Sequence, residues 1–272
     1  MFEGPTFALD VEIRAGADKI AVFFPHRWAT RRAMEREYGA KFAEKYGLNA
    51  LLVRSNGPDW FQADDFEEMA EVIGLVCRNF RHTTFTGSSM GGYGAIRAAE
   101  FYPAELVIAF SPISNIDPGV FPYETGFKDD YDDARPFYVP REHCAGRYRV
   151  FYDSVHRDRQ HVENFALPGN RTDRVPIPCS GHQTSKIIAD AGLLSRITRD
   201  LMDGRNIAGD VATLRRAKRG QPTYLLSLFR KNVRRRPAVA AWAVAEMQAR
   251  GYFPDRMHRF LRQLPDDLRP TG

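Results

Sequence analysis

The sequence predicts an α/β fold: a mostly parallel central sheet with helices on both faces, followed by a C-terminal helical extension. The first observation is that short apolar runs alternate with segments of helical period along residues 1–204. The second is that residues after about Asn206 carry helical patterns and no further strand pattern. A strand that passes through a glycine-rich turn into a helix near residue 89 is the third.

Each strand candidate is a short apolar run that ends at a turn residue. Phe7–Ile13 alternates between apolar and polar residues, which favours an antiparallel edge strand. Arg174–Pro178 is interrupted by prolines and is therefore also expected at a sheet edge. The other strand candidates are Lys19–Phe24, Asn49–Arg54, Thr84–Thr86, Glu105–Phe110 and Tyr148–Tyr152.

The helix candidates repeat their apolar residues every three or four positions. Asp65–Phe80 is the clearest case, with apolar residues at 66, 69, 70, 73, 76, 77 and 80. Arg31–Tyr46 has helical composition and ends before Gly47, and Ile96–Tyr102 ends before a proline. In the C-terminal part the helix candidates are Tyr224–Val233, Ala238–Gln248 and Pro254–Leu264.

Charge and composition divide the chain into two parts. The net charge is +5, but residues 205–272 hold 15 Lys and Arg against 5 Asp and Glu, so residues 1–204 carry −5. We therefore expect an α/β domain over 1–204 and a basic helical extension over 205–272. A Pro-, Gly- and Asp-rich stretch over about 112–146 is too long for an ordinary connection and predicts a small irregular cap. Its acidic run, Asp129–Asp133, is expected to be a solvated loop.

Several classes of protein are disfavoured by composition. No apolar run approaches the ~18 residues of a membrane-spanning helix. The N-terminus lacks a basic segment followed by an apolar one, which favours a cytoplasmic location over secretion. Three widely spaced cysteines, Cys77, Cys144 and Cys179, indicate neither a disulfide framework nor a zinc site. No metal or organic cofactor is implied.

The stretch Thr84-Phe85-Thr86-Gly87-Ser88-Ser89-Met90-Gly91 carries the strongest chemical signal. A β-branched and aromatic run ends in Gly-x-Ser-x-Gly and leads into a helix, which is the context of a nucleophilic serine on a tight turn. Gly87 and Gly91 remove the Cβ atoms that would collide there. Ser89 is therefore the predicted nucleophile. The alternative is a glycine-rich turn without chemistry, or one that binds a phosphate at a helix N-terminus.

A serine hydroxyl needs a general base, and histidine suits that role near neutral pH. His182 follows the last expected strand and is preceded by Gly181, which allows the chain to turn there. The acid that orients the base should follow the preceding strand. Asp158 has room to reach the histidine, whereas Asp153, the alternative acid, could instead brace the loop by accepting backbone N–H bonds.

Two further features accompany this triad. The oxyanion hole is expected to use the backbone N–H of Met90 and one from His26 or Arg27, since Pro25 has none. Arg27 could instead hold an anionic group of the substrate. Trp60 and Phe61, at the carboxyl side of a strand, are expected to wall the substrate pocket or to cover the helix below.

The order Ser89, Asp158, His182 resembles that of the α/β-hydrolase superfamily, over roughly Ala17 to Leu194. The elbow Gly87–Ala95 is similar to that of the esterase-D and feruloyl-esterase-like branch. The resemblance implies Ser89 as nucleophile, His182 as base and Asp158 as acid. The sequence departs from the family at Pro25-His26-Arg27, which replaces the usual His-Gly pair.

The sequence thus predicts a serine hydrolase acting on a carboxylic ester, small-molecule, glycan or lipid, through an acyl-enzyme on Ser89. One alternative is an acyltransferase with the same triad. The other is a degenerate hydrolase domain that binds an anionic surface or an acidic partner through Arg234-Arg235-Arg236 and Lys218-Arg219. No specific nucleic-acid motif accompanies these charges.

Overall fold

A computed structural model describes residues 2–14, 16–27, 38–124 and 126–269 of the chain. It divides into two compact units. The first comprises Met1–Tyr152 and Arg157–Pro176, and the second Asp153–His156 and Ile177–Gly272. In this division the loop that carries His182 belongs with the C-terminal helices. The expected grouping into 1–204 and 205–272 stays a prediction.

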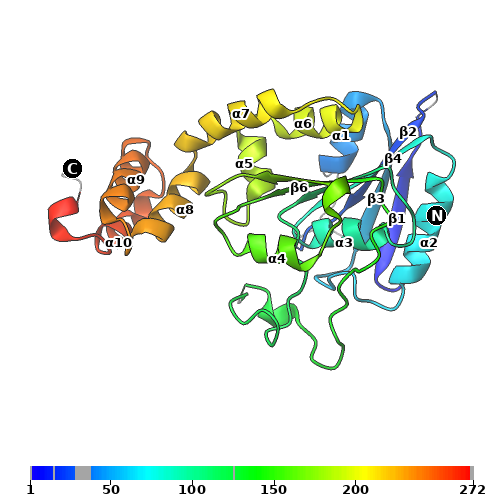
Figure 1. Cartoon of the computed structure of the whole chain (residues 1–272), viewed down its shortest axis with the longest axis horizontal. Helices are drawn as coiled ribbons and strands as arrows, with labels where there is room; N and C mark the ends of the chain where they lie inside the picture. The colour runs from blue at the N-terminus through cyan, green and yellow to red at the C-terminus, as the bar shows by residue number, and fades with distance from the viewer. Residues whose placement is uncertain (1, 15, 28–37, 125, 270–272) are drawn as a thin grey trace. The chain divides into compact units, whose positions relative to one another are not determined.

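The first unit is built on a seven-stranded sheet in the order β1-β3-β2-β4-β5-β6-β7 (Figure 1). All neighbouring strands are parallel except β1, which pairs antiparallel with β3. β1 and β7 form the two edges, as the sequence predicts. The strands are β1 Phe7–Glu12, β2 Lys19–Phe24, β3 Asn49–Ser55, β4 His82–Ser88, β5 Leu106–Phe110, β6 Arg147–Tyr152 and β7 Thr172–Pro176.

Helices cover both faces of this sheet because side chains alternate along each strand. Leu51 and Val53 of β3 join the main core with α2 and α3, whereas Ala50 and Leu52 belong to a second cluster with α1. Figure 1 shows α1 and α3 on opposite sides of the strands. The helices of this unit are α1 Tyr38–Tyr46, α2 Phe66–Cys77, α3 Met90–Ala98 and α4 Asp158–Asn164. The predicted α/β architecture is confirmed.

The start of α3 differs from the prediction. The sequence places a helix start at Ile96, but α3 begins at Met90, so its first turns contain three glycines. These glycines allow close packing: a Cβ on Gly94 would overlap the ring of Phe61. The helix expected over Arg31–Tyr46 is present as α1, and its residues 31–37 lie outside the described residues.

The segment between β5 and β6 is irregular, as expected. In its described part the one helical element is the 3₁₀ turn η1, Lys128–Asp130. The chain of the first unit later makes the 3₁₀ turn η2, Gly169–Arg171, before β7. Loop connections of this length at the carboxyl ends of parallel strands commonly carry binding residues.

The regular elements of the second unit, in its described residues, are helices throughout. They are α5 Thr184–Asp190, α6 Leu194–Met202, α7 Ala208–Ala217, η3 Lys218–Gly220, α8 Pro222–Asn232, α9 Pro237–Ala249, η4 Pro254–Arg256, α10 Met257–Leu261 and η5 Asp266–Leu268. Pro222 and Pro237 each begin a helix, where a missing N–H costs no hydrogen bond. Leu225 and Phe229 of α8 pack with Val244 of α9, so the three C-terminal helices that the sequence predicts are confirmed.

Across the described residues, no helix combines the length and the apolar character that crossing a membrane requires.

Candidate active site

The turn between β4 and α3 holds Ser89 in a strained backbone conformation. Its φ is 56° and its ψ −117°, a region that side-chain-bearing residues rarely adopt and that is found mainly at functional sites. The turn is fixed on both sides: Ser89 N donates to the carbonyl of Phe110 at 2.9 Å, and Tyr93 N donates to the carbonyl of Ser89 at 3.1 Å. Ser89 therefore sits on a sharp, rigid bend at the carboxyl end of a central strand.

Glycines on either side of Ser89 permit this bend. A Cβ on Gly87 would overlap the backbone of Gly91, and a Cβ on Gly91 would overlap the carbonyl oxygens of Phe24 and Pro25. The second contact places the first turn of α3 directly against the loop after β2. The two predicted sources of oxyanion donors, Met90 and the His26–Arg27 pair, thus belong to neighbouring segments.

The side chain of Arg27 is engaged by an aspartate of the acidic run. Its Nε and Nη2 donate to the two oxygens of Asp130 at 2.5 and 2.6 Å, and Trp60 Nε1 donates to the same carboxylate at 2.9 Å. The hydrogen bonds from Arg27 to Asp130 raise the pKa of the guanidinium. The side chain of Asp130 is 5% exposed, so the prediction of a wholly solvated loop is wrong at this position. Asp130 thus links its own loop to the loops that follow β2 and β3 at the carboxyl ends of these strands.

Trp60 and Phe61 occupy different environments although both have positive φ angles, 52° and 56°. Trp60 lines a cavity of about 200 Å³, and Phe61 packs in the core, stacked on Phe7 with ring centroids 5.5 Å apart. Phe61 thus covers α3, the second of its two predicted roles. The cavity is lined by Asp59, Trp60, Gln62, Ala63, Ile116, Asp130, Tyr131, Asp132, Arg135 and Phe137.

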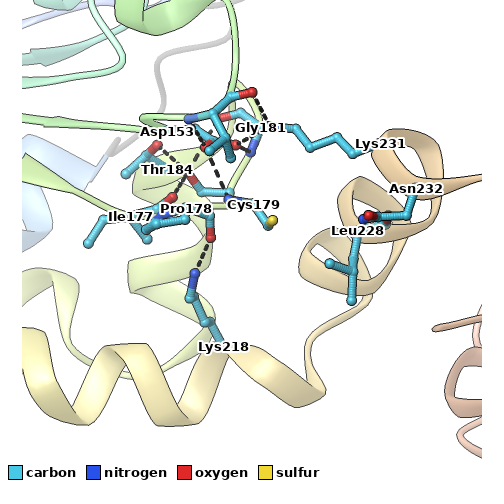
Figure 2. Close-up of polar contacts among 12 residues, drawn as sticks. Asp153, Ile177, Pro178, Cys179, Gly181, Thr184, Lys218, Leu228, Lys231 and Asn232 are labelled. Carbon is cyan, nitrogen blue, oxygen red and sulfur yellow. Dashed lines mark hydrogen bonds and ion pairs between the residues drawn. The ribbon is translucent and has the colours of Figure 1, made fainter. Parts of the chain in front are cut away.

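In the second unit, Asp153 braces the loop that precedes His182 (Figure 2). Its side chain is fully buried, and its Oδ1 accepts hydrogen bonds from the backbone N–H of Val155 at 2.9 Å and of Cys179 at 3.0 Å. Its Oδ2 accepts one from Gly181 N at 2.8 Å. Cys179 and Gly181 have φ angles of 63° and 59°, so the carboxylate stabilises a strained turn.

Asp158, the predicted acid, is fully buried at the first position of α4. It belongs to the same unit as Ser89, whereas His182 and Asp153 belong to the other. The assembly of Ser89, His182 and Asp158 into a triad stays a prediction. No group of three or more His, Cys, Asp and Glu suited to a metal ion occurs among the described residues.

Comparison with known proteins gives relatives by fold and not by sequence. No protein-family model and no curated protein matches the chain. The capsule O-acetyltransferase of Neisseria meningitidis serogroup A, solved with caged gadolinium, is 15% identical over 74% of this chain and 93% of its own, with a TM-score of 0.52. Together with the strand order and the serine elbow, this likeness decides the fold. The chain has the α/β-hydrolase fold.

Other solved structures resemble the chain more partially. The glycosylation-associated protein complex Gap123 of Streptococcus agalactiae gives 14% identity over 72% of this chain and a TM-score of 0.50. The chain spans 44% of the length of that protein. Esterase LipW of Mycobacterium marinum gives 13% identity over 78% of this chain and 81% of its own, with a TM-score of 0.48.

Within the α/β-hydrolase fold, sequence reasoning missed the residues that support the loops. Asp130 gave no signal because it lies inside a run of aspartates, 103 residues from Arg27. Lys218 was assigned, with Arg219, to the basic contact surface of the alternative binding role, but it is 5% exposed and donates to the carbonyl of Pro178. Lys218 is therefore not available to such a partner, whereas Arg219 and Arg234–Arg236 are exposed.

Asp59, beside the strained Trp60, gives a prediction on stability. Its Oδ1 accepts from Ser55 Oγ at 3.2 Å and Phe61 N at 3.3 Å, and its buried Oδ2 has no hydrogen-bond partner among the described residues. Burial raises its pKa from 3.8 to about 7. Between these values the folded protein keeps a proton that the unfolded chain releases, so the free energy of unfolding falls as the pH rises from about 4 to about 7.

Asp59→Asn should therefore stabilise the protein at pH 8 and leave its stability nearly unchanged at pH 4. The amide keeps a carbonyl oxygen for Phe61 N and has no charge to bury, so the gain at pH 8 is roughly 2–4 kcal/mol at ~1.4 kcal/mol per unit of pKa. Urea denaturation at both pH values measures it, with the exposed Asp64→Asn as control. An equal change at both pH values would contradict a raised pKa.

Proposed function

We propose that the protein is a serine hydrolase that cleaves a carboxylic ester through an acyl-enzyme on Ser89. The observation that carries the proposal is the backbone of Ser89, a non-glycine residue held at positive φ between a central strand and a buried helix. Such strain persists where the surrounding structure enforces it, and it exposes the hydroxyl for attack.

In the proposed reaction, Ser89 Oγ attacks the ester carbonyl while His182 accepts its proton. The tetrahedral oxyanion is stabilised by the backbone N–H of Met90 and by one N–H from His26 or Arg27. The C–O bond to the alcohol then breaks, and His182 returns the proton to the departing oxygen. Water attacks the acyl-enzyme in the same manner, which releases the acid and restores Ser89.

Asp158 is the proposed acid that orients His182. Asp153 has both carboxylate oxygens occupied by the N–H groups of Val155, Cys179 and Gly181. A carboxylate used in this way supports the loop, which favours a separate residue as the partner of the imidazole. Asp158 is buried at the start of α4.

An acyltransferase is the second candidate, in which an alcohol replaces water as the acceptor of the acyl group. The likeness to a capsule O-acetyltransferase favours it. So does the cavity beside Trp60, whose lining includes Tyr131, Phe137 and Asp132. Aromatic faces and carboxylates together suit a hydroxylated ring, since its C–H surface packs on the former and its hydroxyls donate to the latter.

The alternative to acyl chemistry is a non-catalytic binding role. Arg234–Arg236 follow α8 and are exposed, which suits an anionic surface or an acidic partner. The cytoplasmic location stays a prediction.

The test combines a fluorophosphonate probe with a panel of p-nitrophenyl esters of short and long acids. The proposal expects one covalent adduct per chain, found on the peptide that contains Ser89, and release of p-nitrophenol. Adding simple sugars or glycerol should accelerate that release and yield the acylated alcohol if the protein is a transferase. A folded protein that the probe leaves unmodified would refute acyl chemistry and favour the binding role.

A further inference from the structure

Two lysines of the C-terminal helices contact the loop that carries His182 or the segment that braces it, Asp153–His156. Lys231, in the last turn of α8, donates to the carbonyl of Val155, and its Nζ lies 3.6 Å from Oδ2 of Asp153. Figure 2 shows this side chain extending from α8 toward Asp153. The contact reaches the same carboxylate oxygen that accepts the N–H of Gly181, the residue before His182.

Lys218 contacts the loop from another element. It begins η3 and donates to the carbonyl of Pro178 (Figure 2). Its side chain is buried, with the ammonium 4.8 Å from the centre of the Tyr224 ring. Burial lowers its pKa. An ammonium group is seldom buried unless it has partners that compensate for lost hydration, so the carbonyl and the ring fix this lysine in place.

The loop before His182 has a strained backbone that other segments must stabilise. Residues 177–181 contain two positive φ angles, at Cys179 and Gly181, and the first of these residues bears a side chain. Their N–H groups are oriented by Asp153, which is fully buried. Burial of a carboxylate is costly unless hydrogen-bond donors and a nearby positive charge compensate for its lost hydration. Lys231 supplies that charge.

We propose that Lys231 and Lys218 are positioning residues that hold the His182 loop in its working geometry. The inference rests on the proposed role of His182 as the base. The basic C-terminal helices are then part of the catalytic apparatus rather than an appendage: Lys231 acts through Asp153 and Gly181, and Lys218 through the carbonyl of Pro178.

The experiment compares three full-length variants. Lys231→Met keeps the length of the side chain and removes its charge, whereas Lys231→Arg keeps the charge. Lys186→Met is the matched control, since Lys186 lies in the same unit on α5, and its pair with Asp190 is exposed at the surface. Amide hydrogen exchange at Cys179 and Gly181 measures directly how often the loop opens. Ester hydrolysis and the rate of fluorophosphonate labelling report its consequence for Ser89.

Lys231→Met should speed exchange at Cys179 and Gly181 at least 10-fold and leave the amides of β4 and β5 unchanged. It should lower kcat and the labelling rate by about 10- to 100-fold with little change in KM, because the loop carries a catalytic group. Lys231→Arg should restore most of kcat and of the labelling rate, and Lys186→Met should resemble the wild type.

Unchanged exchange at Cys179 and Gly181 in Lys231→Met would overturn the proposal. So would faster exchange with kcat and labelling at the wild-type level, since the loop would then move without consequence. A wild-type protein that the probe does not label would refute the proposed function and, with it, a catalytic role for the two lysines. The exchange rates would then still decide whether Lys231 holds the loop.

Discussion

Ser89→Ala should abolish fluorophosphonate labelling and lower kcat for ester hydrolysis by about 10⁵- to 10⁶-fold, the scale seen when a triad serine is removed. The alanine leaves no atom to form the acyl-enzyme. What activity remains would come from stabilisation of the oxyanion by backbone N–H groups, including that of Met90. Initial rates at saturating p-nitrophenyl ester, together with mass spectrometry of the labelled protein, measure both effects.

Ser88→Ala is the matched control for this variant. Ser88 is the last residue of β4 and pairs with Phe110 of β5 through the backbone, which the substitution preserves. We expect Ser88→Ala to be labelled and to hydrolyse esters within a few-fold of the wild type. If Ser88→Ala lost labelling and Ser89→Ala kept it, Ser88 would be the nucleophile, and the predicted role of Ser89 in the elbow would be wrong.

The central strands were predictable because their signal is local. Lys19–Phe24 is recognised with the bounds that β2 has in the structure, since a buried parallel strand is a continuous apolar run and Pro25 ends it. β7 shows the limit of this signal. It begins at Thr172, two residues before the predicted start, because an edge strand needs few apolar residues and its Asp173 and Arg174 are exposed.

The helix α7, Ala208–Ala217, escaped prediction for a related reason. In α7, the side chains of Leu214 and of Asp210 are the buried ones, and a single buried leucine leaves almost no apolar period to detect. By contrast, α2 buries Phe66, Met69 and Ile73 on one face, and its period is plain in the sequence.

The elbow was predictable from sequence, but the contacts that support the loops were not. Ser89 and its glycines are neighbours in sequence, and the steric demand of the turn selects their residue types. Arg27 and Asp130, or Lys231 and Val155, are distant in sequence, with separations of 103 and 76 residues. A charged residue is usually solvated, and only the folded chain shows which charge is buried against which partner.

The choice between the two candidate acids yields the second large prediction. Asp158→Asn should lower kcat by about 10⁴-fold, because without the carboxylate the catalytic histidine adopts the wrong tautomer. Asparagine has nearly the shape of aspartate, so the melting temperature should change little. Kinetics with p-nitrophenyl esters and thermal denaturation of the same sample measure the two quantities.

Asp153→Asn should behave differently because its carboxylate accepts three backbone N–H groups. An asparagine places an NH₂ group against at least one of those donors, and a buried donor left unpaired costs about 1–3 kcal/mol. The melting temperature should therefore fall, and exchange at Gly181 should accelerate. If instead Asp158→Asn kept its activity and Asp153→Asn lost about 10⁴-fold in kcat at an unchanged melting temperature, Asp153 would be the acid and the loop would owe its geometry to other contacts.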